Sequence, residues 1–131
     1  MKPKYVFSRS IYLLLITILI GLSACQSQSI PLAPVPIKNE SNGCWSTKEL
    51  SWEEVKDPSG VKAYYVQVAH EETKSQFEEA VEFGPFHETQ YKMHIDCGRV
   101  FRWAVRVEND EGISSEWSNW IVDDSAVPPG G

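Results

Sequence analysis

The sequence predicts an all-β fold, an antiparallel sandwich of two sheets with about seven strands. In residues 101–107, Phe101, Trp103, Val105 and Val107 occupy every second position, which is the period of a strand with one buried face. Short apolar segments recur between turns rich in Pro, Gly, Asn and Asp, and no long segment after residue 34 has convincing helical spacing. We therefore expect one β-sandwich domain over residues 34–124.

The first 24 residues have the composition of a secretory signal peptide. Residues 1–9 are basic, and residues 11–22 are almost entirely apolar. This apolar run is shorter than the roughly 20 residues of a membrane-spanning helix. The run ends in Leu22-Ser23-Ala24-Cys25, a sequence that resembles the lipobox of bacterial lipoproteins. The resemblance implies cleavage before Cys25 and acylation of its thiol, palmitate included; an ordinary signal peptide followed by a free cysteine is the alternative.

An acylated Cys25 implies attachment to a membrane of the bacterial cell envelope. Gln26, and not Asp, follows the cysteine, and in the enterobacterial sorting pattern this implies the outer membrane. Residues 25–33 are rich in Ser, Gln and Pro, so we expect a lipid-anchored flexible tether there, and a disordered tail over residues 125–131.

The mature chain is expected to be acidic. The leader contains three of the 12 basic residues and none of the 18 acidic ones, so cleavage leaves nine basic residues against 18 acidic ones. A surface of this sign repels nucleic acid, and we expect no nucleic-acid partner.

The strands are expected in order along the chain, separated by turns. Their approximate positions are residues 35–38, 49–52, 61–68, 76–83, 89–95, 101–107 and a last strand that carries Trp117 and Trp120. The charged residues 71–75 are expected to form a loop, and Gly84-Pro85 to end the fourth strand. Residues 76–83 also have spacing compatible with a single helical turn, so both alternatives stay open there.

The last two predicted strands suggest a stack of arginine and tryptophan side chains. Arg102 and Arg106 lie on the face opposite the core, where rings from the next strand, such as Trp117 and Trp120, can pack over the guanidinium groups. These residues are expected to be structural.

The same region carries a family resemblance. The pattern aromatic-x-aromatic-x-Val-Arg-x-x-Asn from Phe101, an acidic-Gly turn and a Ser-x-Trp-Ser run resemble strands F and G of fibronectin type III domains. The run Trp117 to Trp120 is also similar to the Trp-Ser-x-Trp-Ser box of cytokine receptors, with Ile121 in place of the last Ser. The resemblance favours an edge strand over residues 76–83. It also places Phe101 where the family has a tyrosine, so the hydrogen bond of that hydroxyl is expected to be missing.

Two cysteines remain after acylation of Cys25. In the strand order that the resemblance implies, Cys44 lies between the first two strands and Cys97 before the sixth, and these two connections share one end of the sandwich. We expect a Cys44–Cys97 disulfide in the oxidising compartment that the leader implies.

No catalytic constellation is evident in the sequence. His70, His87 and His94 fall in three different predicted elements, without a cysteine or carboxylate at ligand spacing. The paired carboxylates, such as Glu71-Glu72, are expected to be solvated, with a weak calcium site as the alternative. We expect no enzyme activity, no cofactor and no metal.

The leading hypothesis is a lipid-anchored binding or assembly module that contacts another envelope protein through exposed loops or a sheet edge. The alternative is a cell-surface carbohydrate-binding module, for which Trp45 and Phe86 are the candidate ligand aromatics, with Tyr65, Trp117 and Trp120 as further ones. A structural spacer without a ligand is the third hypothesis.

Overall fold

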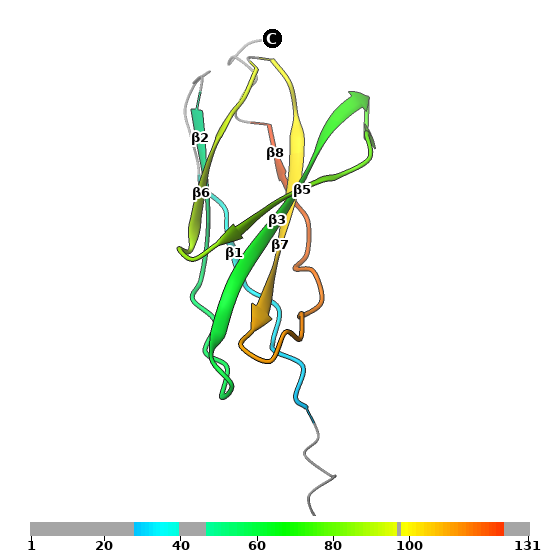
Figure 1. Cartoon of the computed structure of the whole chain (residues 1–131). Helices are drawn as coiled ribbons and strands as arrows, with labels where there is room; N and C mark the ends of the chain where they lie inside the picture. Colours follow the sequence, from blue (N-terminus) through cyan, green and yellow to red (C-terminus); the bar gives the residue numbers. More distant parts are fainter. Residues whose placement is uncertain (1–27, 40–46, 97, 125–131) are drawn as a thin grey trace, which may run out of the picture.

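The structure is a computed structural model that describes residues 28–39, 47–96 and 98–124. The described residues contain strands and no helix, so the predicted all-β antiparallel sandwich is confirmed (Figure 1). The strands are β1 (Pro36–Ile37), β2 (Thr47–Trp52), β3 (Val61–Thr73), β4 (Gln76–Phe77), β5 (Val81–Phe86), β6 (Gln90–His94), β7 (Phe101–Asn109) and β8 (Ile121–Asp123).

The strands form two antiparallel sheets that pack face to face. One sheet has the order β1-β2-β6, and the other has the order β4-β3-β7-β8, with β5 also paired to β3. The longest pairing joins β3 to β7, from Val61 opposite Asn109 to His70 opposite Phe101. Among the described strands, β5 pairs only with β3 and β6 only with β2. The facing edges of β5 and β6 are therefore not hydrogen-bonded to each other, and the sandwich is open along this side.

The core consists of the apolar residues at alternate positions of the strands, whose side chains point between the two sheets. Leu50 and Trp52 of β2 meet residues of β3 and β7, and the Trp52 ring lies 5.5 Å from the Tyr64 ring across the two sheets. The β7 contribution is Phe101, Trp103, Val105 and Val107, each at most 1% exposed. Burial of these large apolar side chains is the main force that holds the sheets together.

A buried ion pair also joins the two sheets. Lys48 of β2 and Asp123 of β8 lie with Nζ 3.0 Å from Oδ2, and both side chains are almost fully buried. Lys48 Nζ also donates a hydrogen bond to the Asn39 carbonyl. Charges removed from water in this way need close partners, and here the ion pair and the hydrogen bond supply them.

Two expected boundaries were wrong. Residues 71–73, expected in a loop, belong to β3, which extends beyond the core and turns back through β4. Gly84 and Pro85, expected to end a strand, lie inside β5. A Cβ at position 84 would stand 2.8 Å from the Tyr65 ring, so glycine permits this close approach at a β-bulge. Proline fits β5 because this strand lies at a sheet edge. Residues 76–83 form no helical turn, so the expectation of strand structure there is confirmed, but they contain two strands, β4 and the start of β5, in place of the single one expected.

The expected last strand was also wrong over Trp117 and Trp120, because the structure begins β8 only at Ile121. Residues 115–120 instead run beside β7 and bind it through serine side chains.

Phe101 lacks the hydroxyl of the tyrosine that the family resemblance places at this position. A different tyrosine, Tyr64, bonds to the backbone: its hydroxyl accepts a hydrogen bond at 3.1 Å from the Val55 N–H.

Candidate functional site

The outer face of β7 carries a stack of cationic and aromatic side chains. The Arg102 guanidinium lies between two rings, with its Cζ 4.3 Å from the centroid of Trp120 and 4.5 Å from that of Phe77. Trp120 remains 37% exposed. Contacts at these distances are cation–π interactions, worth about 0.5–2 kcal/mol each.

Arg106 occupies a second layer of the same stack. Its Cζ lies 4.7 Å from the Tyr65 centroid and 5.1 Å from the Trp117 centroid. Its two terminal nitrogens donate hydrogen bonds to Ser114 Oγ at 2.8 Å and to the Glu82 carboxylate at 3.2 Å. Arg106 is therefore held from several sides by its own chain.

The structure thus brings together the four residues that the sequence grouped, Arg102, Arg106, Trp117 and Trp120. Two further rings, Phe77 and Tyr65, which the sequence did not indicate, complete the stack. Tyr65 pairs with Arg106 across β3 and β7, so the alternation of β3 carries the signal for it. Because these side chains are used in contacts within the domain, the stack is a structural feature of this face.

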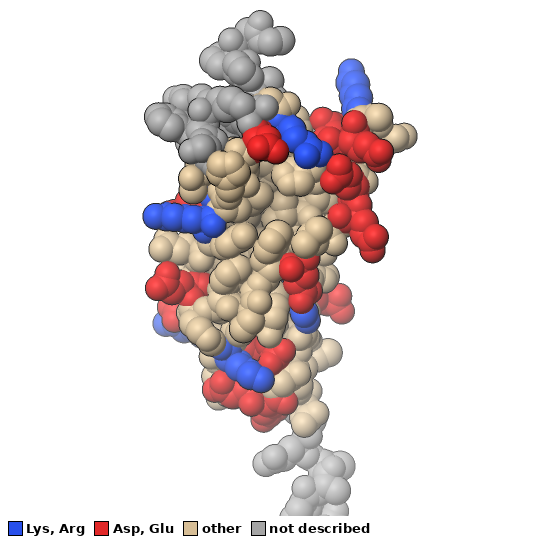
Figure 2. Space-filling view, turned by 45° about the horizontal axis from the view of Figure 1, so that its top comes forward, with Lys and Arg blue, Asp and Glu red and all other residues tan. Residues whose placement is uncertain are grey.

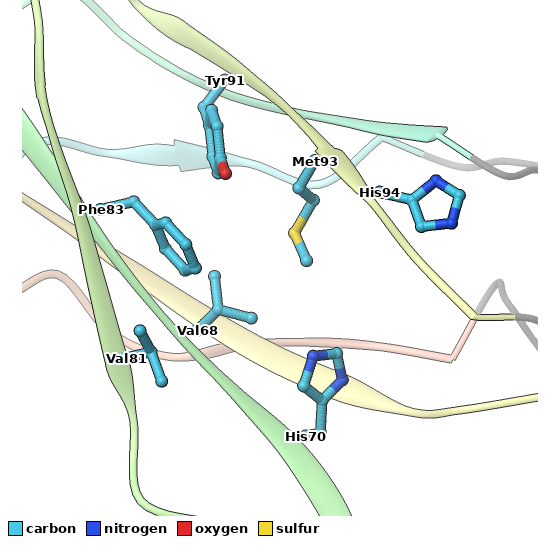
Figure 3. A pocket seen from close by; sticks show the side chains of 7 residues that line it. All are labelled: Val68, His70, Val81, Phe83, Tyr91, Met93 and His94. Carbon is cyan, nitrogen blue, oxygen red and sulfur yellow. The ribbon is translucent and has the colours of Figure 1, made fainter.

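An apolar groove opens at the edge of the sandwich, between β5 and β6. Its volume is about 280 Å³. Its walls come from both sheets, with β3 and β5 on one side and β6 on the other (Figure 3). The lining residues are Val68, His70, Val81, Phe83, Tyr91, Met93 and His94. The groove therefore gives access to the inner faces of both sheets.

Aromatic and aliphatic side chains form most of this groove. The Phe83 and Tyr91 rings lie 5.5 Å apart, and Val81 on the rim is 58% exposed. Phe86, a predicted glycan-binding aromatic, stacks on Tyr91 at 4.6 Å and is partly buried against the core. Its ring therefore packs within the edge of the sandwich.

The fold also brings together two histidines that the sequence placed in separate elements. His70 and His94 both line the groove, while His87 lies elsewhere with Nδ1 3.1 Å from the Lys62 carbonyl. Nδ1 of His70 is shielded from solvent and has no hydrogen-bond partner among the described residues. In the same part of the chain, no three His, Cys, Asp or Glu side chains gather as a metal site.

Acidic side chains outnumber basic ones in the described part of the chain, by 17 to nine. Figure 2 shows the acidic side chains in several groups spread over the face in view, with basic side chains beside some of them. An open hollow adjoins the start of β6 and is lined by Glu54, His87, Glu88, Thr89 and Gln90. In the described part of the chain, neither Glu54 nor Glu88 forms an ion pair.

Several predicted site residues lie outside the described residues. They are the lipid-attachment cysteine Cys25, the expected disulfide partners Cys44 and Cys97, and the aromatic Trp45. Across the described ranges, no helix is long and apolar enough to cross a membrane.

Comparison with known proteins supports the fold. No protein-family model matches the sequence, and no curated protein matches it. Among solved structures, a fibronectin type III domain of human fibronectin type III domain containing protein 3 is similar over 82% of this chain and 96% of that one, with a TM-score of 0.55 and 16% identity. The fourth fibronectin type III domain of a human protein is similar over 82% of this chain and 88% of its own, with a TM-score of 0.51 and 18% identity. The chain therefore contains a domain with a fibronectin type III-like fold.

Proposed function

We propose that this chain is a lipid-anchored, non-catalytic binding or assembly module of a bacterial envelope, and that it acts through protein–protein contacts of its fibronectin type III-like domain.

 The fold is one that suits a protein-interaction module. The single observation that supports a binding role most directly is the apolar groove between β5 and β6, which the domain leaves open to solvent.

The place where the described part of the chain begins is compatible with a lipid anchor at Cys25. The segment that starts at residue 28 reaches the sandwich at the end that also carries residues 57–60 and 110–113 (Figure 1). These two loops contact each other, since the Asp110 N–H donates a hydrogen bond to the Gly60 carbonyl at 3.2 Å. A lipid attached at this end would leave the groove on the side of the domain accessible to a partner.

In-cell cross-linking tests the proposal. A full-length protein with a C-terminal tag is cross-linked in its native cells, and the captured proteins are identified by mass spectrometry beside a Cys25→Ser variant. We expect one dominant envelope protein, reduced or absent with the variant. The absence of any protein above background would contradict the proposed function.

The carbohydrate alternative has a separate test. Phe86 packs on Tyr91 inside the sandwich edge, an arrangement that favours a structural role for this ring. Binding on a glycan array that is lost in Phe86→Ala or Trp45→Ala, with the fold retained, would favour the carbohydrate function instead.

A further inference from the structure

We propose that the outer edge of β6 and the adjoining groove bind an extended, cationic segment of a partner protein, which adds to the sheet as a strand beside β6. This inference rests on the proposed function and names the surface and the chemistry of the partner. Three independent features of the described residues support it: the backbone of β6, the lining of the groove and the excess of acidic side chains.

The backbone of β6 offers a free row of donors and acceptors. The Trp52 N–H donates a hydrogen bond to the Thr89 carbonyl at 3.1 Å, and the register continues with Ser51 opposite Gln90. In an antiparallel pair, hydrogen-bonded and non-hydrogen-bonded residue pairs alternate. The backbone groups that face away from β2 are therefore those of Gln90, Lys92 and His94, and no described strand pairs with this edge.

The groove determines which side chains an added strand must carry. Alternate side chains of such a strand would turn inward, between the two sheets, and the others would turn to solvent. The inward positions meet Phe83, Tyr91 and Met93 (Figure 3). The bound segment therefore needs apolar residues at every second position, while its backbone completes the edge of the sheet.

The acidic balance of the described residues indicates the charge of the partner. The described ranges contain nine Lys and Arg residues against 17 Asp and Glu residues. Five of the nine cations are held in ion pairs, at Lys48, Lys62, Lys92, Arg99 and Arg106. The hollow at the start of β6 adds Glu54 and Glu88 beside Gln90. A segment with Lys or Arg at its ends is complementary to this surface, and an acidic segment is repelled.

A synthetic peptide provides the test. The probe is the capped peptide KKVTVTVKK, with apolar residues at alternate positions and lysines at both ends, and the charge-reversed peptide EEVTVTVEE is its matched control. Binding is measured by fluorescence anisotropy to the purified mature lipoprotein in a non-ionic detergent. We expect the cationic peptide to bind at least tenfold more tightly, and increasingly weakly as salt is raised.

Two lysine substitutions localise the binding. Val81→Lys places a positive charge on the groove rim at a side chain that is 58% exposed, so the fold tolerates it. Ile37→Lys makes the same kind of change on β1, at the opposite edge of the β6 sheet, where the side chain is 41% exposed. We expect Val81→Lys to weaken binding of the cationic peptide at least tenfold and Ile37→Lys to leave it within about twofold.

Hydrogen exchange measured by mass spectrometry reports the added strand itself. We expect the peptide to slow amide exchange in residues 90–94 and not in residues 36–37. Equal affinity for the two peptides, unchanged affinity in Val81→Lys, or protection confined to other strands would overturn the inference. If a partner is captured in cells while these results fail, the proposed function stands and the groove is the wrong surface. If the peptide results hold and no partner is captured, the groove stands as a peptide site and the proposed function fails.

Discussion

Ser118 satisfies both backbone groups of Val105, although Ser118 lies outside any strand. Its N–H donates to the Val105 carbonyl at 2.8 Å, and its hydroxyl accepts from the Val105 N–H at 3.0 Å. Ser115 makes the same two bonds to Val107, at 2.8 Å and 3.0 Å. The two serines therefore take the place of a paired strand along this part of β7.

Removal of the Ser118 hydroxyl tests this arrangement. Val105 is fully buried, so Ser118→Ala leaves its N–H without the acceptor that the serine supplies. We expect the free energy of unfolding to fall by about 1–3 kcal/mol, measured by urea denaturation. As a control, Ser59→Ala changes a serine whose hydroxyl makes no hydrogen bond within the described ranges, and we expect a change of about 0.5 kcal/mol or less. Equal effects in the two variants would contradict the role of the hydroxyl.

The Arg102–Trp120 contact is expected to stabilise the domain. The guanidinium carbon lies 4.3 Å from the Trp120 centroid on a partly exposed face. A double-mutant cycle with Arg102→Ala and Trp120→Ala should give a coupling energy of about 0.5–2 kcal/mol in the free energy of unfolding. Additive effects of the two substitutions would show that the contact contributes no stability of its own.

The Tyr64 hydroxyl gives a third prediction. It accepts a hydrogen bond from the Val55 N–H, and Tyr64 is 2% exposed. Tyr64→Phe keeps the ring in the core and removes only this acceptor, so we expect a loss of about 0.5–1.5 kcal/mol in the free energy of unfolding. Tyr91→Phe serves as the comparison, because no hydrogen bond of the Tyr91 hydroxyl is found in the described part of the chain. A loss no larger in Tyr64→Phe than in this variant would rule the bond out as a stabilising one.

Lys62 links stability to pH at the alkaline end. Its Nζ lies 3.0 Å from Glu108 Oε1, and the hydrogen bond and charge of that carboxylate raise the pKa of Lys62 above its usual value of 10.5. A raised folded-state pKa gives stability that is present below the unfolded-state pKa and is lost as pH rises through the folded-state value. We expect the difference in urea midpoint between the wild type and Lys62→Met to stay constant from pH 7 to 9 and to shrink above pH 10.5. A difference that grows with alkalinity would contradict this linkage.

The sequence predicted the parts of the fold that repeat along a single strand. The alternation from Phe101 to Val107 identified the core face of β7, and the residues between them identified Arg102 and Arg106 as the outer face. These predictions succeed because successive side chains of a strand point to opposite faces of the sheet, so buried and exposed residues alternate in the sequence itself.

The groove was not predicted, because it forms between strands whose own sequences give no sign of it. Phe83 of β5 and Met93 of β6 belong to different sheets, and their juxtaposition depends on how the two sheets pack. The extension of β3 over residues 71–73 was missed for a related reason. Charged residues are uncommon in a half-buried strand, but this part of β3 projects beyond the core. The serine contacts of Ser115 and Ser118 likewise depend on hydroxyl positions that no sequence period reveals.

Site-specific photo-cross-linking shows whether the groove contacts a partner protein in cells. A photoreactive amino acid is introduced in place of Val81 at the groove rim, or in place of Val122 on β8, in the full-length protein within its native cells. Both side chains are exposed, at 58% and 46%, and they lie in the sheet that contains β3 and β7. We expect one dominant cross-linked envelope protein from position 81 and little or none from position 122. Capture of the same protein from position 122 alone, or no capture from either position, would contradict it.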